Sequence, residues 1–242
     1  MADNDSPLKK SSKSFGRSFL LSLYVFLIFS LSFYPVIIAA WAIFYFIQFN
    51  EIWHFLILPF LVYICISILI ISLLLIPGAI IRIFRVRYNH GVYEYSYKNK
   101  MAFKWMLVCS LYTTGRKIIE MLPLGFIKNY YYRLFGMKIG KNALVGGVIK
   151  DPCVTKFGNN TTMGEYAIIY GHIHNYSEGT ITIKNVEIGN NCIIGAGAII
   201  MPGAKVEDGV TIAAGAVVTQ NQVLKKGSTY VGIPAKELKR KD

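Results

Sequence analysis

Two long apolar runs make up most of the first part of the chain. In the second half, a bulky residue recurs at every sixth position. The apolar runs extend from Phe19 to Phe49 and from Ile52 to Phe84, with a short break at Asn50–Glu51. Each has roughly 30 residues, and a helix of that length exceeds a bilayer core of about 30 Å. Neither run has the polar face of a helix in a soluble bundle. The pattern predicts a two-helix transmembrane hairpin over residues 19–84, preceded by a polar N-terminus at residues 1–18.

Residues 85–137 form a connector between the hairpin and the periodic half. Three tyrosines alternate along VYEYSY, residues 92–97, which indicates a short strand. The segment from Met101 to Tyr132 is predicted to form one or two helices, broken near Pro123. An amphipathic helix here could lie at the membrane surface or pack against the repeats. We assign the segment only the role of joining the two parts.

The period of the second half is six residues. The bulky positions are Ile139, Val145, Phe157, Met163 and Ile169, and, after a gap of 19 residues, Ile188, Ile194, Ile200, Val206, Ile212 and Val218. Asp151 is the one exception to the series. Each hexad is expected to form one short strand and one corner, so three hexads close a triangular coil. Residues 18 apart should then be stacked, with Ile194 beside Ile212 and Ile200 beside Val218. A β-sandwich, in which apolar and polar residues alternate with a period of two, does not predict a bulky residue at every sixth position. We assign the repeats to residues 138–224 and a C-terminal tail to 225–242.

These repeats resemble those of the hexapeptide-repeat (isoleucine-patch) acyltransferases. The likeness is carried by VEIGNNCIIGAGAIIMPGAKVEDGVTIAAGAVVT and by the closing YVGIPAKELKR. Upstream, YYRLFGMKIGKNALV next to a membrane hairpin is similar to the C-terminal region of membrane-bound poly-amino-acid synthetases. The resemblance implies an all-β, left-handed parallel β-helix and a homotrimer with active sites between subunits. It also implies acetyl-CoA or another acyl-CoA as co-substrate, with no metal.

The gap in the repeats contains two histidines, His172 and His174, and acyl transfer needs a base for the attacking hydroxyl or amine. Counted from Ile169, His174 ends its hexad, as the catalytic histidine of the family does. The dipeptide Gly171-His172, which resembles the local string GH in those enzymes, favours His172 instead. Either Glu178 or Asp151 could accept a hydrogen bond from the other ring N–H.

Residues for the coenzyme follow from the resemblance alone. It implies that the pantetheine contacts the backbone at Ala196 and Ala214 and the hydroxyl of Thr219. The terminal lysines Lys236 and Lys239 would face the nucleotide phosphates. Arginine is frequent at those places in the family, and lysine supplies charge without a bidentate fork.

The basic residues that flank the two apolar runs predict the orientation of the hairpin in the membrane. The basic flanks are Lys9, Lys10, Lys13 and Arg17 before the first run and Arg82, Arg85 and Arg87 at the end of the second. The intervening loop carries only Glu51, so the positive-inside rule puts both termini in the cytoplasm of a cell-membrane protein. The net charge of +13 suits an anionic leaflet. The chain lacks the interleaved aromatic and basic residues of RNA-recognition sequences, so the sequence does not indicate nucleic-acid binding.

The sequence thus predicts a membrane-anchored, CoA-dependent acyltransferase, most simply an acetyltransferase. Its acceptor would be a hydroxyl or amine of a lipid-linked glycan, a lipid or a small metabolite. One alternative is a non-catalytic membrane-tethered scaffold. Another is a zinc lyase like the γ-carbonic anhydrases, which needs three histidine ligands. Beyond the pair in the gap, the chain has only His54 and His90.

Overall fold

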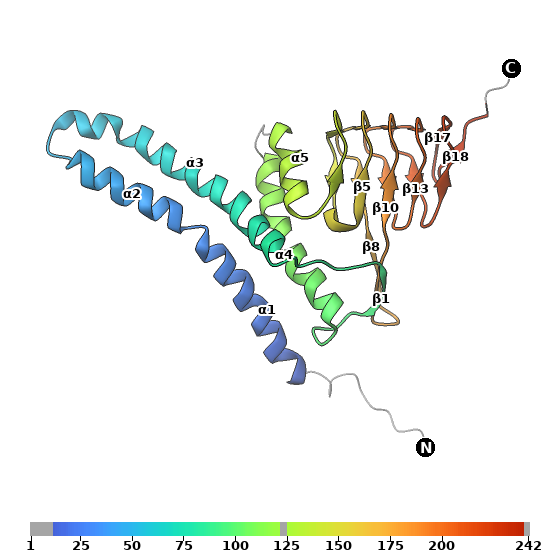
Figure 1. Ribbon diagram of the computed structural model, residues 1–242, viewed down its shortest axis with the longest axis horizontal. Coiled ribbons are helices and arrows are strands. Elements are labelled where there is room, and N and C mark those ends of the chain that lie inside the picture. The colour runs from blue at the N-terminus through green and yellow to red at the C-terminus, as the bar shows by residue number, and fades with distance from the viewer. Residues whose placement is uncertain (1–11, 122–124, 240–242) are drawn as a thin grey trace.

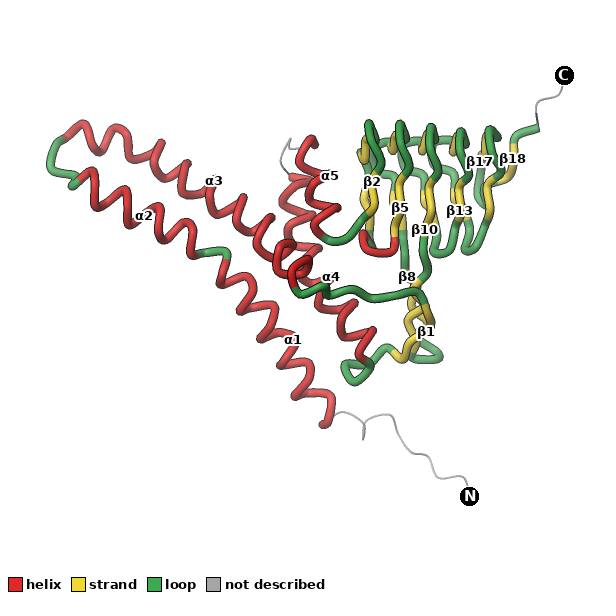
Figure 2. The backbone as a smooth tube through the Cα atoms, in the orientation of Figure 1, coloured by secondary structure: helices red, strands yellow, loops and turns green. Residues whose placement is uncertain are grey.

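The computed structural model describes residues 12–121 and 125–239. In chain order it consists of an apolar helical hairpin, a connector and a parallel β-helix (Figures 1 and 2). The helices are α1 (Ser12–Leu31), α2 (Tyr34–Ile47), α3 (Ile52–Ile83), α4 (Lys100–Met121) and α5 (Gly125–Leu134).

Two helical stretches, Gly16–Ile47 and Ile52–Ile83, are each 32 residues long and apolar enough to cross a membrane. The first differs from the uninterrupted run expected from the sequence, because a turn at Ser32–Phe33 separates α1 from α2. Pro35 explains the break, since proline has no N–H to continue the hydrogen-bond ladder of a helix. The far end of the hairpin, between α2 and α3, projects away from the β-helix (Figure 1).

The connector packs against both neighbours. As predicted, it contains a short strand, β1 (Gly91–Glu94), and two helices, α4 and α5. The predicted break between these helices falls at residues 122–124, outside the described residues. Both helices contact α3, and α5 also covers the first coil of the β-helix. There the side chains of Lys128 and Asn129 each donate to a backbone carbonyl, at 2.7 Å. The first strands are therefore covered instead of exposed as edges.

The β-helix has three parallel sheets, one for each side of the triangular coil. Sheet 1 comprises β2 (Lys138–Ile139), β5 (Thr155–Phe157), β10 (Val186–Ile188), β13 (Lys205–Val206) and β16 (Val223–Leu224). Sheet 2 comprises β3 (Leu144–Val145), β6 (Thr162–Met163), β11 (Ile193–Ile194), β14 (Thr211–Ile212) and β17 (Thr229–Val231), with β18 (Lys236–Glu237) added antiparallel. Sheet 3 comprises β4 (Val148–Ile149), β7 (Ile168–Ile169), β12 (Ile199–Ile200) and β15 (Val217–Val218).

The predicted stacking is confirmed. Ile194 pairs with Ile212 and Ile200 with Val218, in parallel register, and all four are buried. Across the gap in the repeats, sheet 1 pairs residue 157 with residue 188, which is 31 positions on instead of 18. Thirteen residues therefore leave the coil at this point and return to it in phase. They form the hairpin that carries the histidines.

Candidate functional site

The histidines lie on a β-hairpin that leaves the coil between sheet 3 and sheet 1. Its strands are β8 (His172–Asn175) and β9 (Thr180–Ile183), and β1 of the connector pairs with β9 on its other side. Side chains alternate along a strand, so His172 and His174 share one side while Ile173 lies on the other. The hexad count from Ile169 does not apply here, because an antiparallel hairpin has a period of two.

Asp151 is the centre of the site. This residue interrupts the bulky series, and its side chain is completely buried where the preceding coil passes below the hairpin. Its Oδ2 lies 2.6 Å from Nδ1 of His172 and accepts the Gly171 N–H at 2.9 Å. Its Oδ1 accepts hydrogen bonds from the Tyr88 hydroxyl at 3.1 Å and from Trp105 Nε1 at 3.0 Å.

These donors keep the carboxylate ionised despite its burial. Burial opposes ionisation of Asp151, but the hydrogen bond and charge of His172 and the donors from Trp105 and Gly171 outweigh it. The pKa of Asp151 therefore lies below its ordinary value. An ionised carboxylate only accepts hydrogen bonds, so Nδ1 of His172 must carry its proton. In the neutral form of His172 the lone pair is then on Nε2.

Gly171 is required by the close approach of the coil below it. A Cβ at this position would lie 2.6 Å from Cγ2 of Val154 and 2.7 Å from Cβ of Asp151. Glycine thus lets the backbone N–H reach the carboxylate. We call Asp151, Gly171, His172 and His174 the histidine corner.

His174 has a different environment. The rings around it are those of Tyr95, Trp105 and Tyr176, with centroids at 4.7, 5.3 and 5.5 Å. Its Nδ1 is buried and has no hydrogen-bond partner among the described residues. Burial, and then the charge of His172, lower the pKa of His174, although Asp151 acts in the opposite direction. His174 is therefore neutral at neutral pH, and no described residue fixes its tautomer through Nδ1.

The remaining candidates lie elsewhere. Glu178 is exposed in the turn of the hairpin, where its backbone N–H is 3.4 Å from the side chain of Asn175. Asp151, by contrast, contacts His172 directly. Among the described residues, no three His, Cys, Asp or Glu side chains gather as a metal-ligand cluster.

The candidate coenzyme residues are divided between two corners. Ala196 and Ala214 are exposed and stacked between sheets 2 and 3, and we call them the alanine corner. Thr219 lies between sheets 3 and 1, two coils beyond the histidines, and its N–H and hydroxyl donate to Gln222 at 2.9 and 3.1 Å. Lys236 and Lys239 are both exposed at the end of sheet 2. The histidine corner and the alanine corner are on opposite sides of sheet 3, in successive coils.

Sequence reasoning missed the contribution of the connector. Tyr88 and Trp105 come from the segment that we expected only to join two domains, yet both donate to Asp151. A signal was present, because a buried carboxylate needs donors and a buried tryptophan needs an acceptor for its N–H. Burial and the charge of Asp151 also raise the pKa of Tyr88, so this phenol remains a donor.

Residues 185–220 match the family model described as bacterial transferase hexapeptide (six repeats). The β-helix carries bacterial transferase hexapeptide repeats. With its parallel sheets, this hexapeptide β-helix is the left-handed parallel β-helix expected from the sequence.

Several solved structures are similar to this chain. A hexapeptide-repeat-containing acetyltransferase from Vibrio cholerae is 17% identical, and the alignment covers 57% of this chain and 94% of that chain, with a TM-score of 0.44. A maltose O-acetyltransferase from Clostridium difficile 630 is 21% identical, with coverages of 57% and 97% and a TM-score of 0.42. Galactoside acetyltransferase in complex with coenzyme A is 19% identical, with coverages of 52% and 78% and a TM-score of 0.41. No curated protein matches the chain.

Proposed function

We propose that this protein is a membrane-anchored, CoA-dependent acyltransferase that uses a histidine general base. The observation that carries the proposal is the 2.6 Å contact between His172 Nδ1 and the buried Asp151 carboxylate, on a hairpin inserted into hexapeptide repeats. A carboxylate that fixes the tautomer of an imidazole prepares the other ring nitrogen to accept a proton. The acceptor is a hydroxyl or amine of a lipid-linked glycan, a lipid or a small metabolite, and the simplest acyl group is acetyl.

In this mechanism Nε2 of His172 takes the proton of the acceptor as its oxygen or nitrogen bonds to the thioester carbonyl carbon. Asp151 remains ionised and stabilises the imidazolium that forms. His172 then returns the proton to the sulfur as the carbon–sulfur bond breaks. The acceptor leaves acylated and the donor leaves as a free thiol, so atoms and charge balance. The histidine is neutral again for the next cycle.

The aromatic neighbours define the access to this base. The side chain of His172 is 16% exposed, and the Trp105 ring lies edge-on to it at 4.7 Å. Trp105 thus has two roles in the proposal, as a donor to Asp151 and as a wall beside the imidazole. His174, neutral and on the same side of the hairpin, forms the adjacent wall.

A second subunit completes the site in our proposal. The exposed residues Ala196 and Ala214 suit a pantetheine arm, and the exposed Lys236 and Lys239 suit the nucleotide phosphates of the coenzyme. Within one chain these groups are separated from the histidine corner by sheet 3. We therefore propose a homotrimer, in which the alanine corner of one subunit faces the histidine corner of the next.

The membrane hairpin supports a cytoplasmic active site. Large apolar side chains on α2 and α3 are widely exposed, for example Trp41 at 66% and Leu56 at 80%, as expected of lipid-facing positions. Basic residues flank the ends of the hairpin that are nearest the β-helix, and the positive-inside rule puts those ends in the cytoplasm. Acyl-CoA thioesters are then on the same side as His172.

The experiment uses the full chain in mild detergent with radiolabelled acetyl-CoA and fractionated lipid and glycan extracts. We expect acceptor-dependent transfer, which His172→Ala lowers by about 10²–10⁴-fold and His174→Ala by less than about tenfold. If His174→Ala is the inactive variant, the assigned base is wrong. If both variants transfer acetyl groups at the wild-type rate, a histidine base is excluded.

A further inference from the structure

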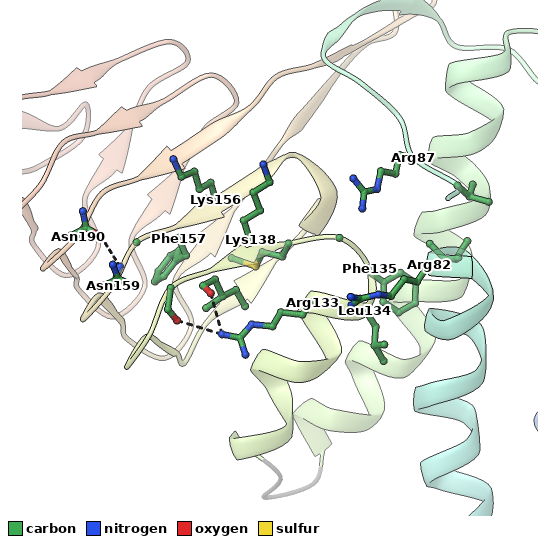
Figure 3. A pocket seen from close by; sticks show the side chains of 17 residues that line it. Arg82, Arg87, Arg133, Leu134, Phe135, Lys138, Lys156, Phe157, Asn159 and Asn190 are labelled. Atoms are coloured by element: carbon green, nitrogen blue, oxygen red, sulfur yellow. Dashed lines mark hydrogen bonds between the residues drawn. The ribbon is translucent and has the colours of Figure 1, made fainter. Parts of the chain in front are cut away.

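A second site lies where the membrane hairpin, the connector and the first coils of the β-helix meet. It is a cavity of about 630 Å³ beside sheet 1 and the last turn of α3. Its basic lining residues are Arg82, Arg87, Arg133, Lys138 and Lys156, and none of its described lining residues is Asp or Glu (Figure 3). We call it the basic pocket.

The two lysines are placed together by the repeat itself. Lys138 on β2 and Lys156 on β5 are direct partners in parallel register, so they share one face of sheet 1. Their side chains extend in the same direction, with Arg87 across the pocket from them (Figure 3). Adjacent strands are about 4.8 Å apart, and like charges directly opposite each other destabilise a sheet. An anion between them would remove this repulsion.

No carboxylate of the described residues forms an ion pair with this cluster, although Glu187 on β10 is the register partner of Lys156 on the side away from Lys138. Within residues 12–121 and 125–239, the close contacts between a basic and an acidic side chain are Arg116–Glu120 and His172–Asp151, and the second is an ion pair only when His172 is protonated. All five cations of the basic pocket are therefore without an ion-pair partner in the described chain. Arg133 is nevertheless fixed in position, because its Nη2 donates to the carbonyls of Ile139 at 3.0 Å and Gly140 at 3.4 Å.

Membrane orientation accounts for only part of this charge. Arg82 and Arg87 flank the end of α3, where the positive-inside rule expects basic residues. Lys138 and Lys156 belong to the β-helix, and Arg133 to α5, so that rule does not explain them. The fold brings groups separated by up to 74 residues into one cavity. Convergence of this kind, without acids, is the arrangement that binds phosphate groups.

We propose that the basic pocket binds a phosphate ester group, and that its source is the headgroup of an anionic membrane lipid. The lipid source follows from the position of the pocket beside Ile81 and Arg82, where the apolar helix α3 ends. This inference goes beyond acyl transfer, because it needs neither the histidine corner nor a coenzyme. The two sites are neighbours all the same: Arg87 lines the pocket, and the next residue, Tyr88, donates to Asp151.

The chain offers a matched pair of variants. Lys138→Gln with Lys156→Gln removes two charges from the basic pocket. Lys205→Gln with Lys226→Gln removes the same charge from the adjacent cavity of sheet 1, which also contains Glu187, Glu207 and Asp208. All four lysines are exposed, so neither double variant should unfold the chain. Relief of the repulsion between Lys138 and Lys156 should leave thermal stability unchanged or slightly higher.

The experiment has two arms and no acyl donor. In the first, the full chain in phosphatidylcholine nanodiscs receives phosphatidic acid, and the lipid retained after purification is measured by native mass spectrometry. In the second, the detergent-solubilised chain is titrated with inorganic pyrophosphate by calorimetry. We expect preferential retention of phosphatidic acid, weakened about 30-fold in the Lys138 and Lys156 double variant and little changed in the control. Retention should also fall with added salt.

The outcomes of the two arms distinguish a lipid headgroup from a free phosphate as the ligand of the basic pocket. Phosphatidic acid retained by the wild type and lost in the pocket variant supports the lipid headgroup. Pyrophosphate binding lost in that variant, without lipid preference, supports a phosphate site but overturns the lipid source. Equal retention of both lipids together with no pyrophosphate binding, or equal losses in the two double variants, overturns the pocket. Because no acyl transfer is measured, these results are independent of the proposed enzyme activity.

Discussion

The histidine corner and the alanine corner belong to the same β-helix but are built in different ways. The alanine corner consists of repeat backbone: Gly215 N–H donates to the Ala196 carbonyl at 2.9 Å, and the small side chains leave the surface open. The histidine corner depends on side chains from distant segments, since Asp151 receives donors from residues 63 and 46 positions away. A repeat can thus supply a surface for binding by itself, whereas an oriented base requires tertiary contacts.

The largest effect should come from Asp151→Asn. Asparagine keeps the shape of the side chain but not the charge that stabilises a His172 imidazolium, so turnover should fall by about 10²–10⁴-fold. The affinity for coenzyme A, measured by calorimetry, should not change, because the alanine corner is untouched. The matched control is Glu178→Gln on the exposed turn of the same hairpin, which should retain wild-type turnover. If the control variant is inactive and Asp151→Asn is active, the partner of the base has been assigned incorrectly.

An intermediate effect is expected from Gly171→Ala. The added methyl group collides with Val154 and Asp151, and such overpacking costs about 1–3 kcal/mol of unfolding free energy. Turnover should fall as well, because the carboxylate must shift away from His172. Thermal unfolding and the transfer assay measure the two effects.

The control for this substitution is Gly209→Asn, at the corner between sheets 1 and 2 and not at the histidine corner. Gly209 has φ +71°, and the stacked position in the neighbouring coil is already asparagine, Asn191, with φ +55°. Asparagine tolerates this conformation, so the melting temperature should change little. A loss of stability in Gly209→Asn equal to that in Gly171→Ala would contradict the idea that close approach to Asp151 is the cause.

The smallest effect concerns pH. The pKa of His174 is lowered in the folded protein, so the unfolded chain takes up a proton at higher pH than the folded chain does. The contribution of His174 to stability is therefore fully present above its ordinary pKa of about 6.5 and is lost as the pH falls through the lower folded value. His174→Asn should weaken the dependence of melting temperature on pH in this range. A dependence as steep as that of the wild type would assign the effect to another group.

Much of the architecture could be read from the sequence because it depends on local pattern. The stacking of Ile194 on Ile212 follows from an 18-residue coil, and the two apolar helical stretches follow from the length and composition of the apolar runs. The turn at Ser32–Phe33 was missed, although Pro35 is a local signal for it. The choice between His172 and His174 could not be made from hexad phase, since the phase ends where the hairpin leaves the coil.

The sequence by itself determined the β-helix and its register, because a repeated pattern fixes the partner of each residue at a constant separation. It also determined the two apolar helical stretches, because their length and composition are local properties of the chain. It also marked Asp151 as an exception in the series. Only the tertiary structure brought Tyr88 and Trp105 to that carboxylate, and only the tertiary structure placed His172 in contact with it. The basic pocket was likewise a product of folding. These arrangements depend on side chains that meet across long and irregular separations in sequence, and no period along the chain encodes such distances.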